Sequence, residues 1–339
     1  MKNECNSLVN FCLFFIFFFL VLANCRVAGA ESSITLKPAT PSNESQVIAA
    51  LKQANVVLWL AAHPDDETSS SALLARAKDL AGRLYMVSLT SGENSDVVWG
   101  GLRRGTEIGA ARARLFAQSA AQLQADGFEI GPFVNGPLSR AELDSMPPGV
   151  PHKDWSSKAT SQDVIEKWAK EREPLEYLVA VLRKIRPDVV ITMDYHCGVS
   201  GHDEHLAVGR LLLQALPMAA DATAIPQAGR PLKVRHVIFN ASVIPQLVAC
   251  QYCKCEREDL PESVEELMSV EPSAQYGMSY FGVTCLVART YESTMKEKGW
   301  TEQEVRHGCE HADKTALQAV REGKTNQWFS ELFRVRSFP

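Results

Sequence analysis

Two polar clusters, each placed shortly after an apolar run, carry the residue types of a metal site. The first lies in "AHPDDE", where His63, Asp65, Asp66 and Glu67 follow the apolar run Val56–Ala61. One imidazole and three carboxylates in a single turn are costly to bring together unless a cation neutralises them. The cluster therefore predicts metal binding. The alternative is that its acids only stabilise the N-terminus of the helix that follows.

The second cluster lies in "GHDEH", a few residues after the apolar run Val189–Met193. If a helix begins at Glu204 or His205, a ring in its first turn can point back toward the strand end. His202 comes three residues before His205, so the two clusters together could supply three or four ligands. A catalytic zinc needs three protein ligands and one open position. The presence of the second cluster therefore favours metal binding over helix capping as the interpretation of the first cluster.

The segments that must position these clusters alternate between strands and helices. Strands are expected at residues 56–61, 84–90, 188–193 and 234–239, and helices at residues 68–80, 103–125, 162–185 and 204–216. This alternation predicts an α/β fold with a parallel sheet and helices on both of its faces. Both clusters then lie at the carboxyl ends of strands, where open α/β sheets bind their ligands.

Two further regions are less regular. Residues 138–160, which contain "MPPGVPHKDW", are expected to form a long proline-rich loop, and loops of that length are often functional. A C-terminal extension begins at about residue 246 and holds most of the cysteines. Its one clear pattern predicts a helix over residues 301–322.

Taken together, these motifs resemble those of the PIG-L/LmbE-like family of zinc-dependent N-deacetylases. The resemblance rests on "AHPDDE", "TSGENSD", "GVSGHDEHLAVG" and the R-x-x-E pair of Arg104 and Glu107, and it extends from about Val56 to Leu216. It implies a Rossmann-like (LmbE-like) α/β domain. The implied reaction removes the N-acetyl group from an N-acetylglucosamine-type amino sugar in a glycoconjugate.

The resemblance also implies a role for the residues of the two clusters. His63, Asp66 and His205 would bind one Zn2+ per chain, which polarises an amide carbonyl and lowers the pKa of a bound water toward ~7. Asp65, next to the ligand Asp66, would act as the general base that accepts the proton of this water. His202, as an imidazolium, would stabilise the negative charge of the tetrahedral intermediate.

Arg104 matches an arginine that the family uses to hold the sugar, and a charge on a helix surface is the alternative explanation. Glu204 marks a departure, because many bacterial members have His-Pro-Asp-His where this chain has His-Asp-Glu-His. A longer carboxylate therefore replaces the one that would orient a metal ligand. Two other functions fit the same fold, a zinc amidase acting on a non-sugar amide and a catalytically silent carbohydrate-binding protein. The intact set of metal-site residues argues against the silent protein.

Composition argues against several other classes of function. With 46% hydrophobic and 22% charged residues the chain is an ordinary globular protein, and its formal net charge of −5 offers no basic surface to nucleic acid. The sequence also has no GxSxG motif and no glycine-rich phosphate loop, which argues against serine hydrolases and nucleotide enzymes. The expected partner is therefore an amino-sugar or glycoconjugate substrate.

The N-terminal region predicts export. A basic residue precedes 13 apolar residues, Phe11–Ala23, and "VAGA" then supplies the small residues of a cleavage site. We expect a signal peptide over residues 1–30, a flexible polar segment over 31–50 and a deacetylase domain over 51–339, with no stable membrane insertion after cleavage. The protein would then be secreted or otherwise extracytoplasmic. The alternative is an uncleaved membrane anchor over Cys5–Cys25.

Six cysteines follow the expected cleavage site, and an even number in an exported chain favours disulfide bonds. They are Cys197, Cys250, Cys253, Cys255, Cys285 and Cys309. The alternative for "CQYCKC" is a structural zinc site, but no matching Cys-x-x-Cys pair follows it. In "HGCEH", His307 and His311 are four residues apart on an expected helix without a third ligand. We interpret them as a solvated helix face, with Cys309 in a disulfide.

Overall fold

The computed structural model describes residues 45–95, 101–150, 153–156, 158–196, 198–241, 264–295, 301–324 and 330–338. All of them belong to one compact unit, Glu44–Pro339. The expected signal peptide lies outside the described residues, as do Cys197 and the cysteines of "CQYCKC". The disulfide prediction is therefore tested only for Cys285 and Cys309.

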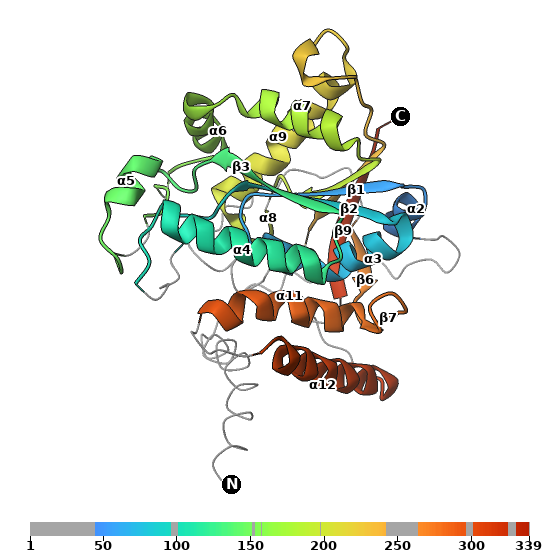
Figure 1. Ribbon diagram of the computed structural model, residues 1–339. Helices are drawn as coiled ribbons and strands as arrows, with labels where there is room; N and C mark the ends of the chain where they lie inside the picture. The colour runs from blue at the N-terminus through green and yellow to red at the C-terminus, as the bar shows by residue number, and fades with distance from the viewer. Residues whose placement is uncertain are drawn as a thin grey trace, which may run out of the picture. The chain divides into compact units, whose positions relative to one another are not determined.

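The described residues form a central seven-stranded sheet with the strand order β3-β2-β1-β4-β5-β9-β6 (Figure 1). Its strands are β1 (Val56–Ala61), β2 (Arg83–Thr90), β3 (Gly127–Phe133), β4 (Val189–Met193), β5 (His236–Asn240), β6 (Val264–Met268) and β9 (Ser330–Ser337). β1 to β5 run parallel, whereas β9 pairs antiparallel with both β5 and β6. Because β1 pairs with β2 on one side and β4 on the other, the order of the strands reverses between β1 and β4. Such a reversal point is where open α/β sheets bind ligands.

Helices cover both faces of this sheet (Figure 1). One layer contains α2 (Gln46–Lys52), α3 (Ser71–Ala81), α4 (Thr106–Gln122) and α11 (Tyr280–Met295), and the other contains α6 (Ser161–Glu171), α7 (Pro174–Ile185) and α9 (Asp203–Ala220). In β1, Val57 and Trp59 pack into the first layer and Leu58 and Leu60 into the second. The strand is apolar throughout because both of its faces are buried.

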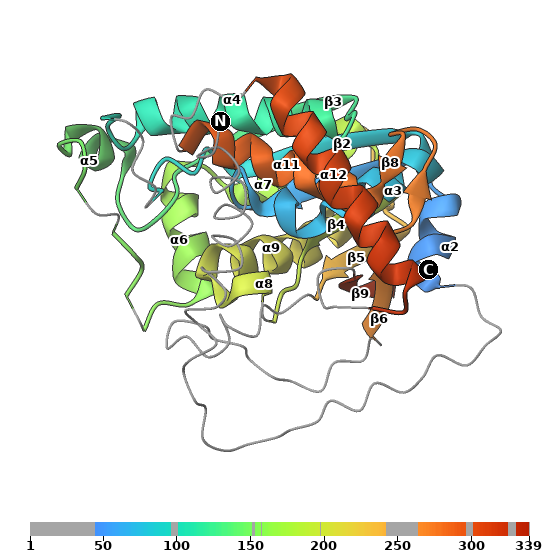
Figure 2. The ribbon, with the colours of Figure 1, turned by 90° about the horizontal axis from the view of Figure 1, so that it is seen from below.

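Smaller elements connect these layers. They are the 3-10 helices η2 (Asp66–Ser70) and η3 (Pro226–Ala228), the short helices α5 (Arg140–Ser145) and α8 (Gly198–Gly201), and the paired strands β7 (Pro272–Ser273) and β8 (Met278–Ser279). Helix α12 (Glu302–Arg321) packs against α11 and crosses it, as the view from below shows (Figure 2). Among the described residues, we find no helix that is both long and apolar enough to cross a membrane.

The α/β fold class and four expected strands are confirmed. β1 has the expected ends, and β2, β4 and β5 differ from expectation by two residues at most. The sheet is not wholly parallel, however, because β9 enters it antiparallel beside β5. The expected single helix over residues 162–185 is wrong. Pro174 begins α7, and a proline disfavours helical backbone in the residue before it, so α6 and α7 are separate helices.

Other elements were not expected from the sequence. β3 contains Gly127, Gly131 and Pro132, which obscure a strand pattern but are tolerated because β3 is the edge strand of the sheet. The expected loop over residues 138–160 contains α5, and the C-terminal third supplies β6, α11 and β9. Helix α2 begins at Gln46, so the folded region reaches into the segment that was expected to be flexible.

Candidate metal and active site

The first cluster lies where β1 ends, in the turn that leads into η2. Asp65 adopts φ 100° and ψ −18°, a left-handed conformation that is uncommon for residues other than glycine. Its N–H donates to the carboxylate of Glu67 at 3.1 Å, and its own Oδ2 lies 2.9 Å from Nη2 of Arg112 on α4. Asp65 therefore pairs with an arginine, whereas the neighbouring Asp66 contacts histidines.

His63, Asp66 and His205 bring three potential ligand side chains together at the reversal point between β1 and β4. Nδ1 of His63 lies 3.2 Å from Nε2 of His205. Oδ1 of Asp66 lies 3.0 Å from this His205 nitrogen, and Oδ2 of Asp66 lies 3.6 Å from this His63 nitrogen. Two ligand atoms of a tetrahedral zinc, each bound at about 2.0–2.1 Å, are roughly 3.3–3.4 Å apart. The three separations are close to this value, with the two Asp66 oxygens each facing one histidine, and all three residues are buried.

Additional contacts orient two of these side chains. Asp66 accepts hydrogen bonds from the N–H groups of Ala62 at 3.0 Å and His63 at 2.8 Å. Nε2 of His63 lies 2.6 Å from a carboxylate oxygen of Glu204, which is fully buried. A carboxylate at the second ring nitrogen fixes the tautomer of a metal-binding histidine. The longer side chain of Glu204 therefore makes the orienting contact that the resemblance implied for a shorter carboxylate.

The loop after β3 holds Glu204 in place. Its Oε2 accepts from Nδ2 of Asn135 at 2.6 Å, and its Oε1 accepts from the N–H of Gly136 at 2.7 Å. Burial alone would raise the pKa of Glu204, but His63 and the Gly136 N–H lower it to about 2. Burial alone would lower the pKa of His63, but Asp66 and Glu204 raise it to about 10. The cluster thus favours a positive charge, as a cation site requires.

His202 lies at the more exposed side of the same cluster. Its ring centroid is 5.1 Å from those of His63 and His205, and one nitrogen from each of the three rings lies within 4.8 Å of the others. Its side chain is 40% exposed. Desolvation and the two neighbouring rings lower the pKa of His202 to about 4, although Glu204 opposes the shift. This direction disfavours the expected imidazolium, and a neutral ring could still donate one N–H.

Arg104 is buried, so the alternative of a surface helix charge is wrong. Its Nε and Nη2 donate to the carbonyl of Val150 at 3.1 and 2.9 Å, and its Nη1 donates to the carbonyl of Ser95. The guanidinium therefore ties together two loops that are far apart in the sequence.

The second cluster is supported from the C-terminal strand. Asp194 follows β4 directly, is buried, and accepts a hydrogen bond from the N–H of His196 at 2.7 Å. Its other oxygen pairs with the guanidinium of Arg334 on β9. This ion pair links the antiparallel part of the sheet to the loop that leads to His202 and His205.

The prediction of a disulfide at Cys309 is confirmed, because Cys285 and Cys309 form a disulfide that joins α11 to α12. His307 and His311 are exposed on α12, as the interpretation of a solvated helix face requires. Within the described ranges, they belong to no group of three or more side chains able to hold a metal ion.

Sequence reasoning missed three residues of the site: Arg112, Asn135 and Tyr291. Arg112 lies in an expected helix, where one arginine among several carries no distinguishing signal. Asn135 follows the strand that was not anticipated. Tyr291 donates to Glu67 across 224 residues of sequence, a contact that no local pattern reveals.

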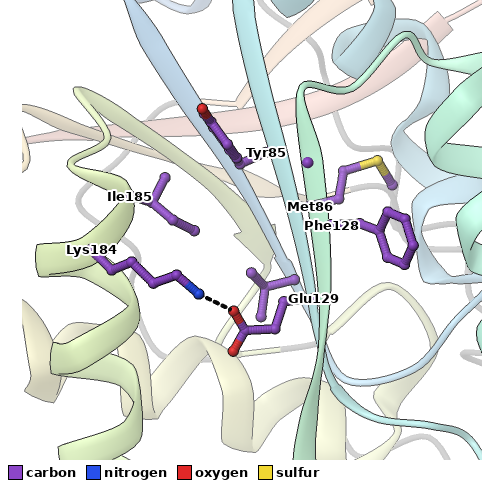
Figure 3. A pocket seen from close by; sticks show the side chains of 8 residues that line it. Tyr85, Met86, Phe128, Glu129, Lys184 and Ile185 are labelled. Carbon is purple, nitrogen blue, oxygen red and sulfur yellow. Dashed lines mark hydrogen bonds and ion pairs between the residues drawn. The ribbon is translucent and has the colours of Figure 1, made fainter.

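A pocket elsewhere on the molecule is not the candidate site. It is lined by residues at the beginning of β2 and β3 and at the end of α7, including Tyr85, Phe128 and Ile185 (Figure 3). Its charged residues, Glu129 and Lys184, neutralise each other at 2.8 Å. The pocket thus lies at the amino ends of these strands, opposite the carboxyl ends that carry both clusters.

The fold and the site together define an α/β protein with a candidate cation site, lined by histidine and aspartate, at the reversal point of its sheet. The profile of the GlcNAc-PI de-N-acetylase (PIG-L) family matches residues 58–216. A 1D-myo-inositol 2-acetamido-2-deoxy-alpha-D-glucopyranoside deacetylase of Rhodococcus erythropolis is 33% identical over 229 residues, which cover 65% of this chain and 73% of the relative. The chain belongs to the PIG-L family.

A second deacetylase with the same name, from Streptomyces avermitilis, is 29% identical over 199 residues, which cover 57% of this chain and 63% of the relative. The match thus spans less than two thirds of that relative's length. Among solved structures, N,N'-diacetylchitobiose deacetylase from Pyrococcus horikoshii superposes with a TM-score of 0.51 at 14% identity, covering 86% of this chain and 89% of the other. This likeness shows a common fold.

Proposed function

We propose that the protein is a zinc-dependent hydrolase that removes the N-acetyl group from an N-acetylglucosamine-type sugar in a glycoconjugate. The observation that carries this proposal is the convergence of His63, Asp66 and His205, with Asp65 and His202 beside them. Similarity to deacetylases of N-acetylglucosaminyl inositol supports the choice of substrate class. A zinc ion held by the three ligands would polarise the acetamide carbonyl and lower the pKa of the attacking water toward ~7.

Asp65 is the proposed general base. It accepts a proton from the attacking water as the water oxygen bonds to the acetamide carbon. Arg112 holds Oδ2 of Asp65 at 2.9 Å and fixes the carboxylate. Burial raises the pKa of Asp65 even though Arg112 opposes the shift. A raised pKa suits a carboxylate that must accept a proton and then release it.

His202 is the proposed donor to the developing oxyanion. A neutral imidazole can donate one N–H to an oxyanion, so the low pKa of His202 is compatible with this role. The carbon–nitrogen bond then breaks as Asp65 returns its proton to the departing amine nitrogen. The products are acetate and the free amino sugar.

Acetate release by the purified protein tests the proposal. The substrates are N-acetylglucosamine, N,N'-diacetylchitobiose and N-acetylglucosaminyl inositol, with a non-sugar acetamide for comparison. We expect release from at least one sugar, loss of release after chelation and recovery with Zn2+. Release from the non-sugar amide alone would instead identify an amidase. Sugar binding without acetate release would identify a silent carbohydrate-binding protein, and either result would contradict the proposal.

We also propose that the protein acts in an extracytoplasmic compartment. The apolar run Phe11–Ala23 followed by "VAGA" and the Cys285–Cys309 disulfide both support export. The intact mass of protein purified from its native source, with and without reductant, tests this proposal. A mass that retains residues 1–30 would favour the membrane anchor.

A further inference from the structure

Helix α11 brings Tyr291 to the turn that carries Asp65. The Tyr291 hydroxyl donates to Oε1 of Glu67, and Oε2 of Glu67 accepts the N–H of Asp65 at 3.1 Å. Tyr291 and Glu67 are both buried. We propose that Tyr291 is a positioning residue that acts through Glu67 to hold Asp65 in its catalytic conformation. This inference rests on the proposed role of Asp65 as the general base.

The backbone of Asp65 needs such support. A residue with a side chain at φ 100° is strained and keeps that conformation only where its surroundings impose it. Arg112 contacts the carboxylate of Asp65 and the carbonyl of Pro64. The carboxylate of Glu67 accepts a hydrogen bond from the N–H of Asp65. A catalytic group displaced by about 1 Å can lose roughly a hundredfold in rate, so this conformation matters for turnover.

Tyr291 is itself firmly held. Its ring packs against Ile108, Ala111 and Leu115 of α4, the helix that also carries Arg112. Helix α11 lies beside α4 in both ribbon views (Figure 1, Figure 2). The Cys285–Cys309 disulfide joins α11 to α12. The hydroxyl therefore reaches Glu67 from a rigid support, as the positioning of a catalytic group requires.

A tyrosine that serves only the core can satisfy its hydroxyl at a backbone carbonyl. Tyr276 does so, because it is buried and its hydroxyl donates to the carbonyl of Leu123 at 2.8 Å. Tyr291 donates instead to a carboxylate whose other oxygen fixes Asp65. Tyr276→Phe is therefore a matched control, since it removes one buried hydroxyl hydrogen bond without touching the site.

The test compares Tyr291→Phe with Tyr276→Phe in the full chain. For Tyr291→Phe we expect kcat for acetate release to fall about tenfold, with KM and zinc content unchanged, because the hydroxyl donates to Glu67, which is not one of the proposed zinc ligands. Deuterium exchange of the segment 60–70 should become about tenfold faster, because the Asp65 amide is less firmly held. Tyr276→Phe should leave both quantities at the parent values.

Exchange is measured without substrate, so it separates this inference from the proposed function. Suppose that the parent releases no acetate and that exchange is faster only in Tyr291→Phe. The proposed function would then be refuted, but the conclusion that Tyr291 supports the Asp65 turn would stand. Unchanged exchange in Tyr291→Phe, or faster exchange with unchanged kcat in an active enzyme, would overturn the positioning role. Glu67→Gln tests the same link from its other end if Tyr291→Phe does not fold. It should reproduce the fall in kcat, and parent-like turnover would overturn the inference.

Discussion

Glu204 is expected to set the affinity for zinc without being a ligand. Its Oε2 accepts from His63 and Asn135, and its Oε1 accepts from the N–H of Gly136. The variant Glu204→Gln keeps the size of the side chain but replaces one acceptor oxygen with an NH2 donor. In one amide orientation this donor faces Gly136, and in the other it faces His63 and Asn135. Either orientation therefore places donors against each other.

The size of the effect follows from these contacts. If Nδ1 of His63 binds the zinc ion, Nε2 would carry the proton and donate to Glu204, which lies 2.6 Å away. A hydrogen bond to a charged group contributes about 1.5–3 kcal/mol, and a tenfold change in affinity corresponds to about 1.4 kcal/mol. Loss of this one contact should weaken zinc binding by about 10- to 100-fold. Loss of the carboxylate beside a metal-binding histidine has effects of about this size.

Competition with a chelating indicator measures this affinity directly. Glu129→Gln is the matched control, because Glu129 also accepts from a hydroxyl and an ammonium group but lies in the pocket at the other end of the strands (Figure 3). It should bind zinc as the parent does. Thermal unfolding in the presence of EDTA shows whether either variant has lost its fold. A folded Glu204→Gln variant with the affinity of the parent would refute the orienting role of Glu204.

Three further outcomes are expected. Asp65→Asn should retain zinc and slow turnover by roughly 10²–10⁴-fold, whereas Asp66→Asn should lose zinc; zinc content and acetate release with the opposite pattern would reverse the assignments. Glu331 accepts two N–H groups at the start of α3, and burial raises its pKa from 4.5 to about 7. The folded state then binds more protons than the unfolded state between these pH values, so its contribution to stability falls as pH rises, by at most about 3 kcal/mol. Glu331→Gln should remove this fall. If the difference in unfolding free energy between the variant and the parent were the same at pH 5 and at pH 8, this prediction would be contradicted. Replacing both Cys285 and Cys309 with alanine opens a loop closed over 24 residues and should lower the free energy of unfolding by about 3 kcal/mol; denaturant curves that coincide with the parent's would exclude this.

The two clusters were predictable because their signals are local. Val56–Ala61 is wholly apolar and Val189–Met193 is apolar except for Thr192, so each marks a strand buried on both faces. The polar residues that follow them then belong at one edge of a parallel sheet. The structure brings His63 and His205 to within 3.2 Å at that edge, although they are 142 residues apart.

The residues that orient the site were not predictable, for two physical reasons. Asn135 follows β3, an edge strand whose glycines and proline hide the alternation on which a strand prediction depends. Tyr291 contacts Glu67, and Arg334 contacts Asp194. Both contacts require the C-terminal third to pack against the region that matches the family. Contacts over 224 and 140 residues depend on the packing of α11 and β9, and periodicity within either segment says nothing about their partners.

The structure that supports the candidate site therefore extends beyond the residues that match the family. Residues 58–216 match the PIG-L family and contain both polar clusters. Two buried carboxylates inside that region, Glu67 and Asp194, nevertheless take a hydrogen-bond donor from outside it. Removing the donor from a buried carboxylate costs free energy, because the interior offers the carboxylate no replacement donor. The C-terminal extension thus completes the support on both sides of the reversal point, and the folded unit that holds the candidate site extends at least to β9.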